Sequence, residues 1–379
     1  MLFSKLILAN CAAGVALSSP LGNSHGLHAA TSKSLEVEDA PSSVRPYIMR
    51  HYAHAQALTI GAQTYRFYVT GPSSGNAFTL MGTNAPTSAS LGVLPHIHQR
   101  HYENFFNLKG QYQLWAQKDN ATQQSRILGP GDYGSVPRNT THTFQILDPD
   151  TEMIGAIAPG GFEQLFFAQG TNLTNPVHTA YVPQFDNETS AAGPDADTIS
   201  SLEAFDVYAQ LDFEPRTDLA NGAAPTGTGW HTQNNNLGQP GSPYFIANGW
   251  GPKYLNSQYG YQIVAPLASS AQTQDTNFTM ATISISVTPN NVTIPDWKLE
   301  GATAFQVIEG KLAVQIAGYP IYELTTGDVA FIPAHMMFRY WSEAAFTKVL
   351  VLSGGHEGVD QELISSGEAY DFVTFPVEW

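Results

Sequence analysis

The side chains best suited to chemistry are three histidines and one glutamate in two short motifs. His96, His98 and Glu103 lie within eight residues, in the stretch LPHIHQRHYENFFNLKG. His142 follows in PGDYGSVPRNTTHTFQ. Three imidazoles and a carboxylate form a competent ligand set for Mn, Fe, Co, Ni, Cu or Zn. The sequence therefore predicts one metal site held by these four side chains, and the ligands alone do not identify the metal.

The spacing of these residues also predicts the elements that position them. Alternate side chains of an extended strand share a face, so His96 and His98 point one way and Ile97 the other. Glu103 lies just past that strand, and His142 comes from a later strand. Two ligands on one strand, a third just beyond it and a fourth from another strand can surround one ion.

Short strands dominate the expected secondary structure. Five of the clearest examples are 64–70, 76–83, 103–110, 111–118 and 141–148. Gly and Pro are plentiful, which suits strands joined by turns, and helical periodicity is scarce. We therefore expect an all-β fold with few helices. The length of 379 residues favours two domains over one.

Composition and the N-terminal segment predict a secreted protein. There are 32 acidic and 16 basic residues, a formal charge of −16, so nucleic acid and anionic membranes are poor partners. Residues 1–20 have the charged start, apolar core and small-residue cleavage region of a signal peptide, and the apolar run is too short to span a bilayer. The only cysteine, Cys11, lies in this segment. The mature chain is expected to be extracellular, without a membrane segment, a disulfide or a thiolate ligand.

Six N-glycosylation sequons fit a secretory route, each an Asn followed by x-Thr with x not Pro. They are Asn120, Asn139, Asn172, Asn187, Asn277 and Asn291. Because glycans are bulky and polar, we expect these asparagines at the surface and N-linked glycans attached to them.

Composition divides the mature chain into three parts. We expect an N-terminal metal-binding, catalytic domain over 21–176, a linker over 177–232 and a C-terminal domain over 233–379. The linker is rich in Gly, Ala, Pro, Ser, Thr and Asp, with one short helix expected near 200–211. A linker of this length inside a compact enzyme often covers a site.

The second domain repeats the pattern of the first. Residues 302–316 resemble 103–117, and residues 327–341 resemble 131–145. Aligning the shared glycines of these segments replaces the four metal ligands by Asp296, Lys298, Thr303 and Phe338. A Lys and a Phe cannot replace imidazoles at a divalent ion. We therefore expect two barrels and one metal.

Both motifs resemble the paired motifs of the cupin superfamily. HIHQRHYENFFNLKG matches the first, with Gly92 closer to His96 than usual. GDYGSVPRNTTH matches the second, with Asn139 where Gly is usual, and neither departure touches a ligand. The degenerate second copy makes the chain similar to a bicupin, which implies two jelly-roll (cupin) β-barrel domains joined by a long linker. Cupins include many chemistries and inert storage proteins, so this fold alone does not give the function.

A more specific resemblance, to the secreted fungal quercetin 2,3-dioxygenases, covers essentially the whole mature chain. It implies one copper ion per chain, held by His96, His98, Glu103 and His142, and no organic cofactor. It implies opening of the flavonol heterocycle with O2, giving a depside and carbon monoxide, and it leaves a homodimer open. The substrate pocket that it implies consists of Tyr65, Met81, Thr83, Phe105, Phe144, Met153, Ile157 and Pro194.

Glu103 is the expected catalytic base, and it can be a ligand, a base or both. In an apolar pocket, and only loosely held by the ion, its carboxyl is expected to have a pKa near the working pH, where it can take the proton of the flavonol 3-hydroxyl. Strand parity supports the pocket independently, since Phe105 shares a face with Glu103 and Phe144 with His142. An aromatic and thioether wall suits a planar polyphenol. A small dianion would instead require an inward Arg or Lys.

Two other functions stay open at this stage. One is an Mn-dependent bicupin oxalate oxidase or decarboxylase, although fungal bicupins of that type typically keep ligands in both barrels. The other is a storage or sugar-binding bicupin without catalysis, which would hold no redox metal tightly. We expect His101 on the rim or surface beside the ligands. The remaining histidines are expected to be structural: His51, His54, His178, His231, His335 and His356.

Overall fold

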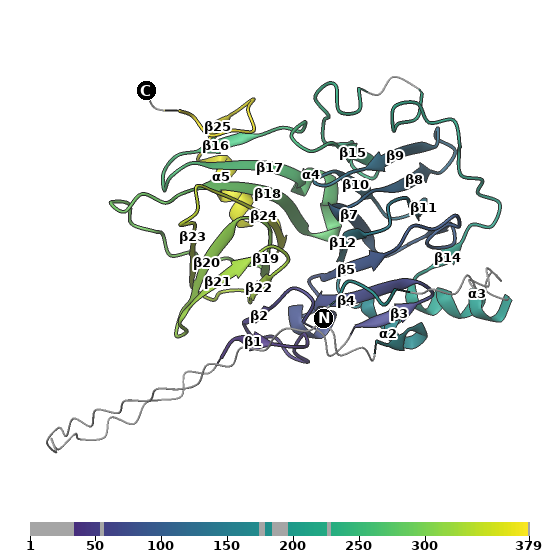
Figure 1. Cartoon of the computed structure of the whole chain (residues 1–379), viewed down its shortest axis with the longest axis horizontal. Coiled ribbons are helices and arrows are strands. Elements are labelled where there is room, and N and C mark those ends of the chain that lie inside the picture. The colour runs from purple at the N-terminus through teal and green to yellow at the C-terminus, as the bar shows by residue number, and fades with distance from the viewer. Residues whose placement is uncertain (1–33, 54–56, 174–178, 184–195, 226–228, 378–379) are drawn as a thin grey trace, which may run out of the picture. The chain divides into compact units, whose positions relative to one another are not determined.

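The strands form four sheets within one compact unit that begins at Ser34. The computed structural model describes residues 34–53, 57–173, 179–183, 196–225 and 229–377 (Figure 1). Within these ranges no helix exceeds seven residues. The helices are α1 (Gly71–Ser74), α2 (Glu163–Gln169), α3 (Ala196–Leu202), α4 (Ser270–Thr273) and α5 (Val359–Ser365), with 3-10 turns η1 (Glu203–Phe205) and η2 (Gln274–Thr276). The predicted all-β fold with few helices is confirmed.

Two sheets form the first barrel. An eight-stranded sheet has the order β13-β3-β4-β5-β12-β7-β10-β15, and a five-stranded sheet has the order β14-β6-β11-β8-β9. The strands of the first are β3 (Leu58–Ile60), β4 (Gln63–Val69), β5 (Thr79–Ala85), β7 (Tyr102–Lys109), β10 (Tyr133–Val136), β12 (Thr151–Ala158), β13 (Thr171–Asn172) and β15 (Tyr244–Ile246). Those of the second are β6 (His96–Ile97), β8 (Tyr112–Lys118), β9 (Gln124–Leu128), β11 (Thr140–Ile146) and β14 (Tyr208–Ala209).

Two further sheets form the second barrel. A nine-stranded sheet has the order β1-β2-β22-β19-β24-β18-β17-β16-β25, and a three-stranded sheet has the order β21-β20-β23. The nine strands are β1 (Glu36–Val37), β2 (Tyr47–Met49), β16 (Tyr254–Asn256), β17 (Gln262–Ala268), β18 (Phe278–Ser286), β19 (Thr303–Glu309), β22 (Val329–Ile332), β24 (Phe346–Gly354) and β25 (Glu368–Ala369). The three are β20 (Lys311–Ile316), β21 (Ile321–Thr325) and β23 (Phe338–Trp341).

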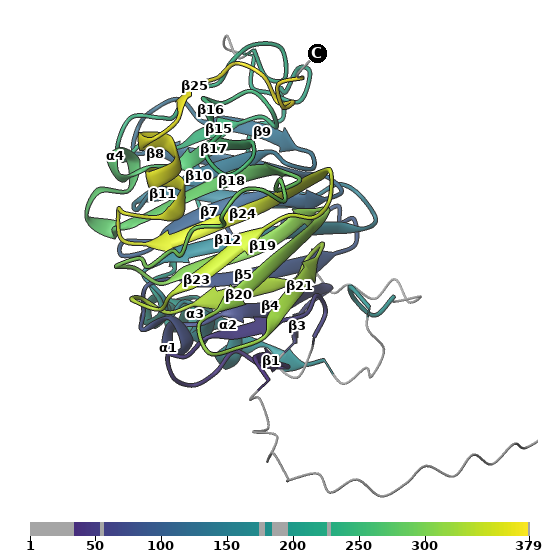
Figure 2. The ribbon, with the colours of Figure 1, turned by 90° about the vertical axis from the view of Figure 1, so that its left-hand side faces the viewer.

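Apolar side chains pack inside each barrel and between the two large sheets. Phe105 and Phe144 belong to a cluster inside the first barrel, and Phe305 belongs to one inside the second. A third cluster includes Phe106 from the eight-stranded sheet and Phe331 from the nine-stranded sheet. Figure 2 shows these two large sheets one in front of the other. Burial on both faces makes them the centre of the molecule.

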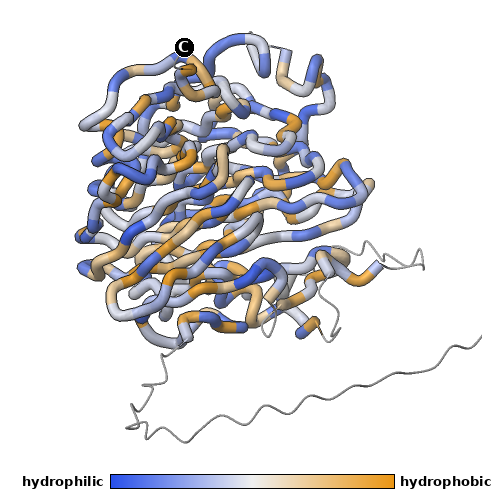
Figure 3. Tube along the Cα trace, turned by 60° about the vertical axis from the view of Figure 1, so that its left-hand side comes forward, coloured by the Kyte–Doolittle hydropathy of each residue, from blue (hydrophilic) through white to orange (hydrophobic). Residues whose placement is uncertain are grey.

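Successive side chains of strand β7 point alternately into two different apolar cores. Phe105 belongs to the cluster inside the first barrel, whereas its neighbour Phe106 belongs to the cluster between the large sheets. Glu103 shares the face of Phe105 because side chains repeat every second residue. Figure 3 shows the same alternation of hydrophobic and hydrophilic residues along many strands. The period of two therefore points Glu103 into the first barrel.

Two strands cross the domain boundaries that the sequence predicts. β2, from the N-terminal part, pairs with β22 of the second barrel, with Tyr47 opposite Phe331. β15, from the C-terminal part, pairs with β10 of the first barrel, with Ile246 opposite Tyr133. The boundaries at 176 and 232 stay predictions. Backbone hydrogen bonds nevertheless tie each barrel to a segment from the other side of the linker.

The described part of the predicted linker packs against the first barrel. Arg66 of β4 is buried and donates hydrogen bonds to the carbonyl oxygens of Thr179 (2.6 Å) and Ala180 (2.9 Å). The expected short helix is present but begins earlier, as α3 at Ala196, and η1 continues it to Phe205. β14 then pairs with β6, the strand that carries His96. The linker thus reaches the predicted metal site.

Candidate metal centre and substrate cavity

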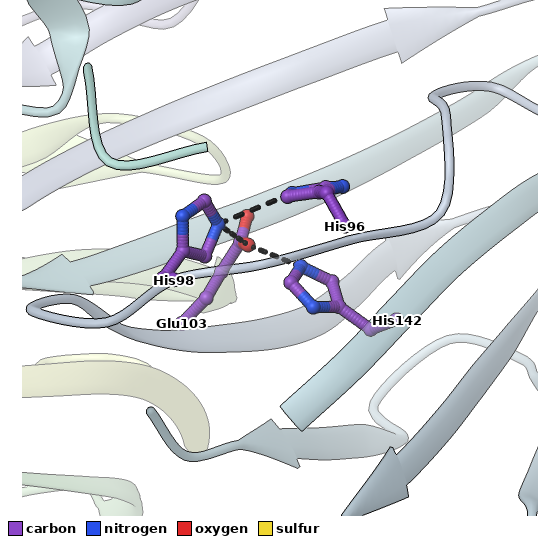
Figure 4. Close-up of side chains that lie close together, drawn as sticks. All are labelled: His96, His98, Glu103 and His142. Atoms are coloured by element: carbon purple, nitrogen blue, oxygen red, sulfur yellow. Dashed lines mark hydrogen bonds and ion pairs between the residues drawn. The ribbon is translucent and has the colours of Figure 1, made fainter. Parts of the chain in front are cut away.

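Three strands and one turn bring the predicted ligands together. His96 on β6 lies directly opposite His142 on β11. His98 follows β6 in a turn, and Glu103 comes from β7 on the opposing sheet. Figure 4 shows the four side chains pointing toward one another. Their donor atoms all lie within 4.8 Å of one another, although sequence separations reach 46 residues (96 to 142).

The distances between these donor atoms define a compact centre. His98 Nε2 lies 3.2 Å from His96 Nε2 and 3.2 Å from Glu103 Oε2. His142 Nε2 lies 2.9 Å from the same carboxylate oxygen. The three imidazoles are buried, and the Glu103 side chain is 14% exposed. A bound ion here would be shielded from bulk water on most sides.

Backbone carbonyls determine which ring nitrogen of each histidine faces the centre. The Nδ1 atom of His96 lies 2.7 Å from Leu94 O, and that of His142 lies 3.0 Å from Thr140 O. The Nδ1 atom of His98 lies 2.7 Å from the backbone oxygen of Asp206. A carbonyl only accepts, so each Nδ1 donates to its carbonyl and each Nε2 faces the centre, where a neutral ring presents a lone pair.

Electrostatics make this arrangement fit a cation. Burial and the neighbours His142 and His98 hold the pKa of His96 well below its usual value, which keeps that ring neutral. Burial acts to raise the pKa of Glu103, but its contacts with His142 and His98 lower the pKa by more, so the carboxyl is ionised. A cation bound between neutral rings and this carboxylate would meet three nitrogen lone pairs and one negative charge. These residues fit a divalent transition metal.

The contacts of Glu103 with His142 and His98 shift its pKa in the direction opposite to the effect of the apolar pocket. The expectation of a pKa near the working pH considered the apolar pocket, which disfavours the charged carboxylate. The structure adds His142 and His98, whose contacts with the carboxylate act in the opposite direction and prevail. The assignment of Glu103 as a base stays a prediction, and the ionised form is the one that can accept a proton.

A cavity of about 900 Å³ opens beside His96 and Glu103. Six of the eight predicted pocket residues line it: Tyr65, Met81, Thr83, Phe105, Phe144 and Met153. Among the described residues that line the cavity, none is Arg or Lys. Its wall is therefore apolar and aromatic, with hydroxyl groups from Tyr65 and Thr83. Pro194 lies outside the described residues.

Ile157 is not among the residues that line the cavity. Ile157 of β12 pairs with Glu103 of β7, so it lies level with the metal centre. It is 1% exposed and packs in an apolar cluster with Met81 and Phe162. The contact of Ile157 with the substrate stays a prediction.

Gly155 lines the cavity between Phe105 and Met81 of the paired strands. Because Gly155 has no side chain, Met81 packs closely over it, and a Cβ atom at Gly155 would lie 3.2 Å from Met81 Cγ. The glycine therefore leaves room for the Met81 thioether in the cavity wall.

Helix α2 and the linker supply walls that the sequence analysis missed. Phe162, Leu165 and Phe166 line the cavity from the start of α2, and Leu202 and Val207 line it from the linker. The apolar residues at spacings of three and four in FEQLFFAQ were a signal for a buried helix face. No sequence pattern singled out Leu202 or Val207, because their burial depends on where the linker lies.

One prediction about the remaining histidines is wrong. His101 is 7% exposed, not on the rim, and its Nδ1 atom lies 2.7 Å from the Asp206 carboxylate. Other histidines contact structural carboxylates: His51 lies against Glu152 and His231 against Asp132. His335 is exposed, 3.6 Å from Glu300, and His356 is partly buried. His54 and His178 lie outside the described residues.

The second barrel holds different chemistry at the aligned positions. Phe338 is buried in the apolar cluster of that barrel, and Lys298 is exposed. Asp296 is exposed and pairs with Arg339. Within the described ranges, the clusters of His, Cys, Asp and Glu that could hold a metal contain residues of the first barrel and the linker only. The turn glycines are nevertheless duplicated, with positive φ at Gly110, Gly131, Gly310 and Gly327.

The sequon asparagines lie where glycans could be attached. Five of the six are exposed: Asn120, Asn139, Asn172, Asn277 and Asn291. Asn187 lies outside the described residues. No helix in the described part of the chain is long and apolar enough to cross a membrane.

Known structures define the class of this fold. The chain matches an oxalate decarboxylase of Lactobacillus farciminis with a TM-score of 0.51 and 15% identity, over 84% of this chain and 89% of that one. It matches a variant of the Bacillus subtilis oxalate decarboxylase with a TM-score of 0.50 and 14% identity, over 85% and 80%. At such identities the likeness concerns the fold alone. The protein is a bicupin.

Sequence comparison defines the family. No family model matches the chain. It is 63% identical over 347 residues to the quercetin 2,3-dioxygenase of Aspergillus japonicus, covering 91% of this chain and 99% of that protein. It is 29% identical over 142 residues to that of Bacillus subtilis strain 168, covering 38% and 40%. The chain belongs to the quercetin 2,3-dioxygenase family, which confirms the family and the enzyme class predicted from the motifs.

Proposed function

We propose that this protein opens the heterocyclic ring of flavonols such as quercetin with O2, releasing a depside and carbon monoxide. The observation that carries the proposal is the juxtaposition of one three-histidine, one-glutamate centre with an apolar cavity of about 900 Å³. Family membership supplies the reaction, and the cavity supplies a place of suitable size and polarity for its substrate.

We propose copper as the metal, one ion per chain, held by the four side chains of the centre. Family membership and an oxidising, extracellular setting support copper over the other metals that the ligands accept. When bound, the ion would act as a Lewis acid toward the substrate and as a redox partner for O2. Metal analysis of active protein from a eukaryotic host tests this choice. Full activity with Mn and no Cu would overturn it.

The chain's own residues would prepare the substrate. The ionised Glu103 carboxylate can take the proton of the flavonol 3-hydroxyl, since Glu103 lines the cavity. Phe105, Phe144 and Met81 can hold the ring system by stacking and sulfur–ring contacts. The apolar walls exclude water from the reacting carbons.

The alternatives are less well supported. An oxalate-converting enzyme needs a cationic pocket for a small dianion, and none of the described lining residues is Arg or Lys. A storage bicupin has no need for three histidines and one glutamate whose ligand atoms all lie within 4.8 Å of one another. The discriminating assay follows the loss of quercetin absorbance together with O2 uptake and CO release. Consumption of oxalate without quercetin turnover would contradict the proposal.

We also propose that the protein is secreted after loss of residues 1–20 and carries N-linked glycans. The exposure of the five described sequon asparagines supports attachment of glycans. Mass spectrometry of protein from culture medium, before and after an endoglycosidase, tests both points. A retained N-terminal segment or an unchanged mass would contradict them.

A further inference from the structure

A linker residue is hydrogen-bonded to the metal centre. Asp206 follows η1 with φ 67°, in the left-handed region that Asp tolerates better than most residues, and it is fully buried. Its backbone oxygen accepts the hydrogen bond from His98 Nδ1 at 2.7 Å. Leu94 and Thr140, the corresponding acceptors for His96 and His142, lie two residues before their histidine in the chain. His98 alone among the three depends on a residue more than 100 positions away.

The carboxylate of Asp206 holds the turn that carries His98. Oδ1 accepts the backbone N–H of Gln99 at 3.0 Å. Oδ2 accepts the backbone N–H groups of Arg100 (2.9 Å) and His101 (3.0 Å) and the Nδ1–H of His101 (2.7 Å). Four donors converge on one buried carboxylate, which therefore fixes the conformation of the chain directly after His98.

We propose that Asp206 is a positioning residue that completes the metal centre from the linker, through its carbonyl contact with His98 and its carboxylate contacts with residues 99–101. This inference rests on the metal site of the proposed function. Outer hydrogen-bond partners of a ligating histidine orient the ring and raise its basicity. Asp206 does both for His98, and it touches neither the ion position nor the substrate cavity.

The same linker segment also lines the substrate cavity, so the cavity and the metal centre depend on one segment. Leu202 and Val207 line the cavity on either side of Asp206. Ala209 of β14 pairs with His96, and Gln210 N–H donates to Pro95 O at 2.7 Å. A shift of residues 202–210 would therefore move a cavity wall and two ligands together.

A second cation between His98, His101 and Asp206 is the competing explanation of this cluster, since their atoms also lie within 4.8 Å of one another. Hydrogen bonds already account for the contacts, because the Nδ1 atoms of both histidines reach Asp206 oxygens at 2.7 Å. A positioning role predicts one bound ion per chain. A ligand role predicts two.

The test uses the full chain with Asp206→Asn and the matched linker variant Asp218→Asn. Asn tolerates the left-handed conformation, and the backbone carbonyl that accepts from His98 is unchanged. The side-chain NH2 group of Asn, however, replaces one of the carboxylate oxygens that accept hydrogen bonds from residues 99–101. Asp218 lies in an exposed ion pair with Arg216. The affinity for Cu²⁺ is measured by competition with a chelator, the site by electron paramagnetic resonance of Cu²⁺, and the fold by thermal unfolding.

We expect Asp206→Asn to bind Cu²⁺ about 10- to 100-fold more weakly than the parent, with altered resonance parameters, while Asp218→Asn matches the parent. Equal affinity and an identical spectrum in Asp206→Asn would overturn the proposal, as would a second equivalent of Cu²⁺ lost with Asp206. These readouts need no turnover. A parent that binds Cu²⁺ but leaves quercetin intact would instead contradict the proposed function.

The unmodified protein provides an independent measurement if the variant does not fold. If Asp206 supports the binding of Cu²⁺ to His98, bound Cu²⁺ must in turn stabilise the linker segment that contains Asp206. We expect Cu²⁺ to slow hydrogen exchange of the amides of residues 99–101 and 206–207. Protection at 99–101 with unchanged exchange at 206–207 would overturn the proposal.

Discussion

Gly92 lies so close to Phe144 that a Cβ atom at Gly92 would be 2.1 Å from Cε2 of the Phe144 ring. The backbone N–H of Gly92 donates to Phe144 O at 2.7 Å, and the Gln63 side chain donates to Gly92 O at 2.5 Å. These bonds hold the segment around Gly92 over the ring, which lines the substrate cavity. The position of a cavity wall therefore depends on a missing side chain.

Gly92→Ala is expected to displace the Phe144 ring and narrow the cavity. We expect a raised KM for quercetin, unchanged metal content, and a loss of about 1–3 kcal/mol in unfolding free energy from overpacking. Gly129→Ala is the control, because its nearest neighbour, Asp132, would be 3.7 Å from the new Cβ atom. Steady-state kinetics and denaturant unfolding measure both effects. A normal KM in Gly92→Ala would show that the loop yields instead of the ring.

Glu103→Gln tests the proton transfer. The amide keeps the shape and one oxygen of the carboxylate but cannot accept the proton of the flavonol hydroxyl. We expect the variant to retain metal and to lose about 10²- to 10⁴-fold in kcat, the usual contribution of a positioned base. The exposed Glu214→Gln is the control. Full turnover by Glu103→Gln would remove the base role, and loss of metal would assign Glu103 chiefly to binding.

The ligand set could be predicted from the sequence because its information is local. The alternation of a strand places His96 and His98 on one face, and the duplicated turn glycines place Glu103 and His142 relative to them. The aromatic wall followed from the same parity together with the family resemblance. The donor atoms of the four predicted ligands lie within 4.8 Å of one another.

The parts that could not be predicted depend on contacts distant in sequence. Leu202, Val207 and Asp206 reach the site because β14 pairs with β6 and because Arg66 holds the start of the linker. His101 was misplaced for the same reason, since its burial requires the Asp206 carboxylate. Composition identifies a linker, but it carries no signal for which barrel face the linker covers.

Removal of a single histidine should distinguish one metal site from two. We expect one ion per chain in the parent, none in His142→Ala, and one in His335→Ala, whose histidine is exposed in the second barrel. Metal bound only to the folded state stabilises it, by about 2.7 kcal/mol at 100 times the dissociation constant. A chelator should therefore lower the Tm of the parent and of His335→Ala, but not that of His142→Ala. Two ions per parent chain would contradict the single site.

Asp360 in α5 provides a pH dependence away from the metal. Burial raises the pKa of this carboxyl in spite of hydrogen bonds from Gln361 and Thr279. A raised pKa means that the folded state holds the proton to higher pH than the unfolded state. The associated stability is complete below the unfolded pKa and is lost as the pH rises through the folded pKa. At neutral pH the ionised Asp360 therefore destabilises the fold.

Asp360→Asn should remove this effect while keeping an acceptor for the Thr279 hydroxyl, which lies 3.0 Å from Oδ1. We expect the variant to unfold at a higher temperature than the parent at pH 7, by an amount that shrinks toward pH 4. Each unit of pKa shift corresponds to about 1.4 kcal/mol. Asp275→Asn is the control with the opposite sign, because a hydrogen bond from Arg138 lowers the pKa of that exposed carboxyl. If Asp360→Asn lowers the Tm equally at pH 7 and pH 4, the hydrogen bonds to the carboxylate outweigh its burial.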